Sequence, residues 1–383
     1  MIERIFHPIG QGAFYSERHN DFNIVYDCGT EWKNRANKTI NKTIKQSFSE
    51  DDIIDILFIS HFDYDHVSKI KVLKEHVRTI NKVVMPLLHD NEKYLLSNIY
   101  RALNFNILTL INNPQEFFGD ETQIITIIPT ENNETPLNDN IAPQSIDTLT
   151  TTSIESGSIL SKTFDTYDWI FIPYNYQYNT RNSQLENLLR TKGFDVDRLK
   201  GDTNYTLDKI ISDMRISKSK GGKFFREIYD KLDGRINQNS MLLYSGLNCV
   251  RKNCEKEVFI FDYPHRYCEI FYHIRWRRMA REEYRVSCLY TGDTDLNIVK
   301  IKSIFSKFWK SIGTIQIPHH GDLKSFDKKV FEDKHYWCPI SVGQKNSYGH
   351  PSPRVIANIL SQASCPILVT ENLTSSFIER IRC

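Results

Sequence analysis

The feature that most constrains this chain is a cluster of four potential metal ligands within six residues, His61-Phe62-Asp63-Tyr64-Asp65-His66. It follows directly on the continuous apolar run Ile53 to Ser60, which is typical of a buried strand. Proteins of the α/β class place their sites at the carboxyl ends of such strands. Two imidazoles and two carboxylates this close together would repel or lose hydration unless a cation neutralised them. The cluster therefore indicates a metal site, and the alternative is a solvated acidic loop with two chance histidines.

The segments on either side of this cluster predict an α/β fold. Phe22 to Tyr26 is typical of a strand that stops at Asp27-Cys28-Gly29-Thr30, and Val83 to Met85 predicts another strand. Between them, Ser68 to Thr79 has apolar residues at helical spacing. Strand, loop, helix and strand in this order is typical of the α/β class.

The middle of the chain has a different character. Residues 131–165 are rich in Asn, Thr, Ser and Asp, which predicts a long loop or a partly disordered insert. A strand is expected at 169–172, and residues 183–233 carry apolar side chains at helical spacing. We therefore expect one catalytic domain split by an insertion that is partly loop and largely helical, with the domain at 1–94 and 233–383 and the insertion at 95–232.

The composition is that of an ordinary soluble protein. Of the 383 residues, 40% are hydrophobic and 25% are charged, and a net charge of +2 does not indicate a general nucleic-acid binder. The N-terminus predicts a first strand rather than a signal peptide, and no apolar stretch approaches the roughly 18 residues of a membrane span. Eight scattered cysteines are interpreted as free thiols of a reducing compartment. We therefore expect a cytoplasmic protein that does not associate with a membrane.

Three later segments add further candidate ligands. A strand that ends in Gly-Asp presents Asp293, a carboxylate that could bridge two cations. A second strand ends in the pair His319-His320. A third strand and turn, Ser341 to Pro351, presents His350. Each segment is weak alone, but all three in this order after the first cluster strongly indicate a metal-dependent site.

Together these motifs resemble the metallo-β-lactamase family, because His-x-Asp-x-Asp-His is a variant of its His-x-His-x-Asp-His motif. The whole set is similar to the hydrolase domain of ComEC-type DNA-uptake proteins, over roughly residues 5–85 and 235–380 and without their transmembrane channel. Two positions depart from the family: Val67-Ser68-Lys69-Ile70 replaces the usual glycines, and Ala13 replaces an aspartate. Three further motifs belong to the resemblance: Ile9-Gly10-Gln11-Gly12, Asp27-Cys28-Gly29 and Asn237-Gln238-Asn239-Ser240.

The resemblance implies an αββα sandwich of the metallo-β-lactamase fold that binds two divalent metal ions. His61 and Asp63 would hold one ion, Asp65 and His66 would hold the other, and Asp293 would bridge them. An aspartate at position 63 makes the site more anionic, which favours Mn²⁺ or Zn²⁺ with a phosphate ester. Two ions about 3.5–4 Å apart would lower the pKa of a bridging water and generate hydroxide at neutral pH.

The resemblance also implies roles for the remaining polar residues. His320 would complete one metal shell, as the His-His pair of related choline-phosphate esterases indicates, and Asp27 would orient a ligand or its loop. His319 and His350 could each be a ligand, a phosphate contact or a proton donor to the leaving group. We expect the catalytic residues to be Asp65, His319 and His350, and the pair Asn239-Ser240 to contact substrate.

A basic and aromatic stretch precedes the strand that ends at Asp293. Its arginines, which include Arg275, Arg277 and Arg278, alternate with aromatic residues. Guanidinium groups suit phosphates and aromatic rings stack on bases, so these three arginines are candidate substrate contacts. The alternative is a hairpin with solvated arginines and inward-facing rings.

The sequence therefore predicts a phosphodiesterase, foremost a nuclease that acts on DNA or RNA. One alternative is a phosphodiesterase for small molecules such as cyclic nucleotides or choline-phosphate headgroups. The other is a non-catalytic scaffold module of a bacterial defence complex, in which the insertion would dock a protein partner.

Overall fold

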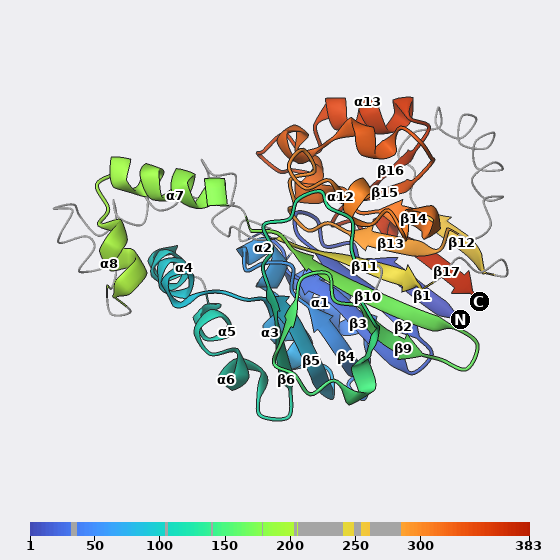
Figure 1. Cartoon of the computed structure of the whole chain (residues 1–383), viewed down its shortest axis with the longest axis horizontal. Coiled ribbons are helices and arrows are strands. Elements are labelled where there is room, and N and C mark those ends of the chain that lie inside the picture. Colours follow the sequence, from blue (N-terminus) through green and yellow to red (C-terminus); the bar gives the residue numbers. More distant parts are fainter. Residues whose placement is uncertain are drawn as a thin grey trace.

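The computed structural model describes residues 1–31, 37–103, 106–138, 141–177, 179–202, 205, 240–248, 254–260 and 285–383. These residues form two β-sheets that pack face to face, with helices on their outer faces (Figure 1). The four layers are the αββα sandwich of the metallo-β-lactamase fold, so the predicted fold class is confirmed.

The first sheet has the strand order β12-β17-β1-β2-β3-β4-β5-β6-β8. The strands from β12 to β3 in this order pair antiparallel, and those from β3 to β8 pair parallel. β4 lies in the parallel half and is flanked on both sides, which explains its continuous apolar run. The strands are β1 (Ile2–Phe6), β2 (Phe14–His19), β3 (Phe22–Cys28), β4 (Ile53–Phe58), β5 (Thr79–Pro86), β6 (Gln123–Ile128), β8 (Ser153–Glu155), β12 (Glu255–Ile260) and β17 (Phe377–Arg382).

The second sheet has the strand order β16-β15-β14-β13-β11-β10-β9-β7. Its strands are β7 (Gln144–Ser145), β9 (Leu160–Thr163), β10 (Asp168–Asn175), β11 (Met241–Leu247), β13 (Ser287–Tyr290), β14 (Ile312–Ile315), β15 (Trp337–Ser341) and β16 (Cys365–Val369). β13, β14, β15 and β16 pair parallel. The loops that follow β13, β14 and β15 therefore leave the sheet at one edge, where they can converge.

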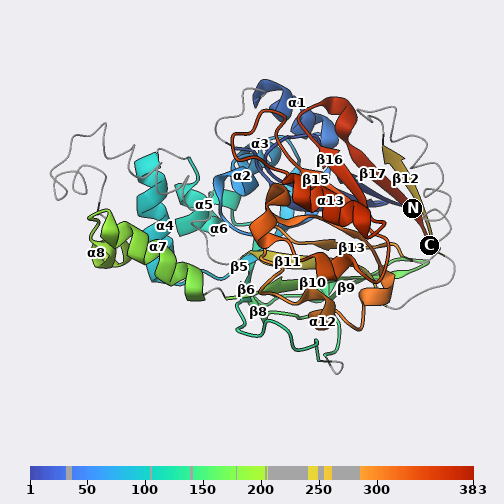
Figure 2. The ribbon, with the colours of Figure 1, turned by 90° about the horizontal axis from the view of Figure 1, so that it is seen from above.

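Helices cover the outer face of each sheet. The first sheet carries α1 (Asn37–Ser47), α2 (Tyr64–Val67), α3 (Ile70–Lys74), α4 (Asp90–Leu103), α5 (Leu108–Asn112) and α6 (Pro114–Phe118), and the second carries α12 (Ile301–Ile304) and α13 (Pro353–Ser361). α7 (Asn179–Thr191) and α8 (Val196–Gly201) lie beyond α4 at one end of the molecule in both views (Figures 1 and 2). The core consists of three apolar clusters, one between the sheets and one under each helical layer.

Much of the segment that was expected to be an insertion, residues 95–232, belongs to the two sheets. It supplies β6 and β8 to the first sheet and β7, β9 and β10 to the second. β7, β8 and β9 fall within residues 131–165, where the polar composition predicted a loop. We therefore propose that, within the described residues, the insertion proper is limited to two helical parts, α4 to α6 before these strands and α7 and α8 after them. Residues 206–239 lie outside the described residues.

The helix expected at 68–79 is limited to α3, Ile70–Lys74, and a separate short helix, α2, precedes it at Tyr64–Val67. The break falls at Ser68, whose hydroxyl donates to the Thr30 carbonyl at 2.8 Å and accepts from the Thr30 amide at 3.0 Å. These two bonds hold the turn after α2 against the loop after β3. The described part of the chain has no helix that is long and apolar enough to cross a membrane.

The expectation that all cysteines are free thiols is wrong for one pair. Cys254, just before β12, forms a disulfide with Cys383, just after β17. The two residues are 129 positions apart in the sequence, and antiparallel pairing of β12 with β17 brings them together. Cys28, Cys288, Cys338 and Cys365 are buried free thiols, and Cys249 and Cys268 lie outside the described residues.

Candidate metal centre

The predicted ligands of the first cluster lie in the short connection from β4 to α2. Asp63 is the extended residue before α2, with φ −64° and ψ 144°, and Asp65 and His66 lie in the helix itself. This change of backbone conformation separates the directions of the side chains on either side of it. His61, Asp63 and His66 are almost fully buried, so the cluster is not the solvated loop of the alternative interpretation.

Two glycines of the neighbouring motifs allow the backbone around α2 to pack closely. A Cβ atom on Gly12 would lie under 3.0 Å from the carbonyl oxygen of Asp65. A Cβ atom on Gly29 would lie under 3.0 Å from backbone atoms of both Asp65 and His66. Gly12 also has φ +152°, a backbone conformation that residues other than glycine rarely adopt. The two glycines thus allow β3 and the loop before β2 to support the turn that carries the ligands.

Asp27, which the sequence analysis expected to orient a ligand, makes hydrogen bonds to the strand end and the helix of this turn. Its Oδ1 atom accepts a hydrogen bond from the Ser60 amide at 2.6 Å. Its Oδ2 atom accepts from the Ser60 hydroxyl at 2.6 Å and lies 2.8 Å from Nδ1 of His66. A carboxylate only accepts, so Nδ1 of His66 carries a proton and Nε2 is available to a metal.

Asp293, in the loop after β13, lies between two imidazoles. Its Oδ1 atom is 3.3 Å from Nε2 of His66, and its Oδ2 atom is 3.6 Å from Nε2 of His61. These three residues form a group whose ligand atoms could hold one ion. Within the described part of the chain, Nε2 of His61, Nε2 of His66 and Oδ1 of Asp293 are buried and make no hydrogen bond. A cation would satisfy all three atoms, so the residues fit a metal.

His320 joins Asp65 and His66 in a second group that could hold an ion. Its Nε2 atom lies 2.9 Å from Oδ2 of Asp65, which in turn lies 4.0 Å from Nε2 of His66. Its Nδ1 atom lies 2.8 Å from the carbonyl oxygen of Ser341, the last residue of β15. Because a carbonyl only accepts, Nδ1 of His320 donates this bond and Nε2 faces Asp65.

Asp63 lies beside these two groups and is not a member of either. Its Oδ2 atom is 3.7 Å from Nε2 of His61, and its Oδ1 atom accepts a hydrogen bond from the hydroxyl of Tyr100 at 3.0 Å. Burial raises the pKa of the Asp63 carboxyl to about 7. Tyr100 comes from α4, a helix to which the sequence analysis assigned no role in the site.

Neighbouring imidazoles lower the pKa values of two carboxyl groups in the centre. Burial opposes ionisation of Asp65, but the imidazoles of His66 and His320 outweigh it and hold the pKa of Asp65 at about 2. Burial likewise opposes ionisation of Asp293, but His319 and His66 hold its pKa well below the ordinary value. A bound cation would stabilise the same carboxylate charges directly.

His319 and His350 lie at the rim of the centre, where the sequence analysis left their roles open. Nε2 of His319 is 3.7 Å from Oδ2 of Asp293, and Nδ1 of His319 is 3.6 Å from Oδ2 of Asp322. Nε2 of His350 is 4.0 Å from Oδ1 of the same Asp322. The sequence analysis missed Asp322, although it stands directly after the His-His-Gly motif. His319 and His320 both have positive φ, 48° and 55°, which directs the two neighbouring side chains to different groups.

Of the predicted substrate contacts, the structure describes only Ser240. Its hydroxyl accepts a hydrogen bond from the amide of Asp293 at 2.8 Å and lies 3.5 Å from Nδ1 of His61. Ser240 is buried, behind two of the predicted ligands. Asn239, Arg275, Arg277 and Arg278 lie outside the described residues.

The match to a family model agrees with this architecture. Residues 12–135 match the family model of the Metallo-beta-lactamase superfamily, and a comparison with curated proteins finds no match. Among solved structures, the metallo-beta-lactamase fold protein YhfI from Bacillus subtilis matches at 14% identity with a TM-score of 0.17, over 22% of this chain and 37% of that chain. Human tRNase Z, short form, matches at 10% identity with a TM-score of 0.36, over 95% of this chain and 91% of that chain.

The family match includes the first half of the candidate centre. Its range, residues 12–135, contains Asp27, the cluster His61 to His66 and Tyr100. The second half, with Asp293 and His320, comes from the second sheet. Residues 12–135 are therefore similar to the Metallo-beta-lactamase superfamily, within a chain that has the metallo-β-lactamase fold.

Proposed function

We propose that this chain is a two-metal hydrolase that cleaves phosphodiester bonds in DNA or RNA. The observation that carries the proposal is the position of Asp293, whose two carboxylate oxygens face different imidazoles, Oδ1 toward His66 and Oδ2 toward His61. A carboxylate in this position can bridge two ions. The buried and unbonded ligand atoms around it support the presence of cations.

The distances in the centre support one division of the candidate ligands. In it, His61, Asp63 and Asp293 would hold one ion, and Asp65, His66, His320 and Asp293 would hold the other. Ions bound there supply a water of lowered pKa and positive charge beside the phosphoryl oxygens. Three carboxylates and three imidazoles, without a thiolate, favour Zn²⁺ or Mn²⁺.

The chain's own residues position the metal ligands and provide a proton. Asp27 and the Ser341 carbonyl accept hydrogen bonds from the ligand imidazoles and direct Nε2 of each toward the centre. We propose that His319 donates a proton from Nε2 to the leaving oxygen, because Nε2 lies 3.7 Å from Asp293 in the centre and Asp322 beside Nδ1 orients the ring. His350 lies beside the same carboxylate and can supply the proton instead.

The preference for nucleic acid rests on the sequence. The ComEC-type resemblance favours DNA, and the arginine-rich stretch that contains Arg275, Arg277 and Arg278 suits a phosphate backbone. The family match supports a metal-dependent hydrolase in general terms.

A cleavage assay with single- and double-stranded DNA and RNA tests this proposal. We expect cleavage with Mn²⁺ or Zn²⁺ and none with EDTA. Asp65→Asn should reduce the rate at least about 100-fold, because loss of a ligand exceeds the roughly 10–100-fold cost of losing an outer hydrogen-bond partner. Asp120→Asn, at an exposed carboxylate after α6, is the matched control and should retain the rate.

Two outcomes would overturn the proposed substrate. Hydrolysis of bis-p-nitrophenyl phosphate without cleavage of any nucleic acid would point to a small-molecule phosphodiesterase. Folded protein that binds two ions but hydrolyses neither kind of substrate would point to a scaffold role.

A further inference from the structure

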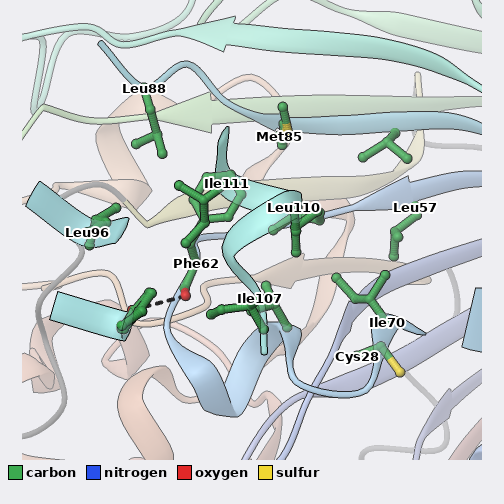
Figure 3. Packing of buried hydrophobic residues seen from close by; sticks show 14 of the residues in the cluster. Cys28, Leu57, Phe62, Ile70, Met85, Leu88, Leu96, Ile107, Leu110 and Ile111 are labelled. Atoms are coloured by element: carbon green, nitrogen blue, oxygen red, sulfur yellow. Dashed lines mark hydrogen bonds between the residues drawn. The ribbon is translucent and has the colours of Figure 1, made fainter. Parts of the chain in front are cut away.

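The helix α4 places a buried tyrosine hydroxyl against one of the proposed metal ligands. Tyr100 is fully buried, and its hydroxyl donates toward Oδ1 of Asp63 at 3.0 Å and toward the carbonyl oxygen of Phe62 at 3.1 Å. Figure 3 shows Phe62 within the surrounding apolar cluster, with the bond to its carbonyl oxygen drawn as a dashed line. The tyrosine therefore contacts both the backbone and the side chain of the ligand loop.

The hydrogen bond distinguishes between the two oxygens of Asp63. A phenol has one proton, which the two acceptors share, and the acceptors lie on consecutive residues of the same loop. The bond to Oδ1 leaves Oδ2 facing Nε2 of His61 at 3.7 Å. Tyr100 thus fixes the rotation of the carboxylate and determines which oxygen is offered to an ion.

The position of Tyr100 is set by the helical part of the molecule. The side-chain amide of Asn98, two residues earlier, donates to the carbonyl oxygens of Leu199 and Asp202 at 2.9 and 3.2 Å. Leu199 lies in α8 and Asp202 directly follows it. Leu96 of α4 and Ile107, beside α5, belong to the same buried cluster as Phe62 (Figure 3). α4 is therefore anchored to α8 on one side and to the ligand loop on the other.

We propose that Tyr100 is a positioning residue of the metal centre, and that through it the packing of α4 against α8 controls the affinity of the site for one ion. This inference rests on the proposed two-metal function. Outer hydrogen-bond partners of metal ligands are worth 10–100-fold in affinity. The hydrogen bond also offsets part of the free-energy cost of burying the carboxylate away from water. Its loss should therefore add to the loss of metal affinity.

The test is a measurement of metal binding to the full chain, by calorimetry with Zn²⁺ and with Mn²⁺. Tyr100→Phe should weaken the binding of one ion by about 10–100-fold and leave the second ion within about threefold. The matched control is Tyr174→Phe, which removes a phenol bond of 2.6 Å to the carbonyl of Asn132, a residue outside both groups of candidate ligands. It should leave both affinities unchanged.

A double variant separates positioning from a general effect on structure. In an Asp63→Asn background, Tyr100→Phe should cause little further loss of affinity, because the carboxylate on which it acts is already absent. Asn98→Ala keeps the tyrosine but removes the anchor to α8, so it should also weaken the binding of one ion. This variant provides the test if Tyr100→Phe does not fold. Unchanged affinities in both Tyr100→Phe and Asn98→Ala would overturn the inference. Wild-type protein that binds no ions would overturn the proposed function instead.

Discussion

Replacement of Asp27 by asparagine tests how the fold prepares His66 for a metal. The carboxylate is fully buried and accepts three hydrogen bonds, two from Ser60 and one from Nδ1 of His66. Asparagine keeps the shape but puts an N–H group in place of one acceptor. If the side-chain oxygen of the asparagine accepts the hydrogen bond from the Ser60 amide, its NH₂ group faces Nδ1 of His66. Two hydrogen-bond donors then face each other. His66 can relieve this conflict by moving its proton to Nε2, which then has no lone pair for an ion.

The magnitude follows from the role of the bond. Loss of a partner that orients a ligand imidazole costs about 10–100-fold in metal affinity, which is about 1.4–2.8 kcal/mol. The metal-free protein also loses a charge-assisted bond, for which mutational series give about 1.5–3 kcal/mol. The two effects are separable, because the first depends on metal concentration and the second does not.

The assay is competition between the protein and a chelating dye for Zn²⁺, with denaturant unfolding of the metal-free protein beside it. The matched control is Asp55→Asn, since Oδ2 of Asp55 also accepts a backbone bond, from Asn23 at 2.8 Å, but on β4 away from the ligand loop. We expect Asp27→Asn to lose affinity for Zn²⁺ and Asp55→Asn to keep it. A folded Asp27→Asn variant with wild-type affinity for both ions would refute the reasoning about the His66 tautomer.

Three further predictions concern stability. Gly29→Ala should lower the free energy of unfolding by about 1–3 kcal/mol or more, because its Cβ atom would overlap the backbone of Asp65 and His66, and an unchanged denaturant midpoint would contradict this. Removal of metal by EDTA should lower the melting temperature. Relative to protein with metal at 100 times its Kd, the free energy of unfolding should fall by about 2.7 kcal/mol, and an unchanged melting temperature would argue against metal binding. Burial lowers the pKa of His7 from 6.5 to about 3, so between these values the unfolded chain binds more protons and stability falls as the pH falls. His7→Gln should reduce this slope by up to about 1.4 kcal/mol per pH unit between pH 6 and 4, and equal slopes would be the contrary result.

The sequence predicted the parts of the site that are local in the chain. His61 to His66 follow an apolar strand within six residues, and Asp293 and His320 each follow a strand of their own. The carboxyl ends of the parallel strands β13 and β14 meet at one edge of the second sheet, whereas β4 lies in the first sheet, so only the resemblance to the family predicted that the two halves of the site converge. Asp27 was found because it ends β3 in a motif that resembles the family.

The residues that the sequence analysis missed act across the fold. Tyr100 lies 37 positions from Asp63, in an amphipathic helix where a tyrosine normally packs in the core. No local sequence pattern predicts its hydrogen bond to Asp63. The disulfide between Cys254 and Cys383 likewise depends on strand pairing over 129 positions. The strands β8 and β9 were hidden because they are only three and four residues long and consist partly of polar residues.

The central claim is that His61, His66, Asp293 and their neighbours hold two ions, and native mass spectrometry tests it most directly. We predict two divalent ions per wild-type chain and two in the Asp120→Asn control. Asp293→Asn should hold one ion or none, because we propose that this carboxylate would bridge the two ions. Wild-type chains without metal after exposure to Zn²⁺ and Mn²⁺, or an Asp293→Asn variant that retains both ions, would contradict the account.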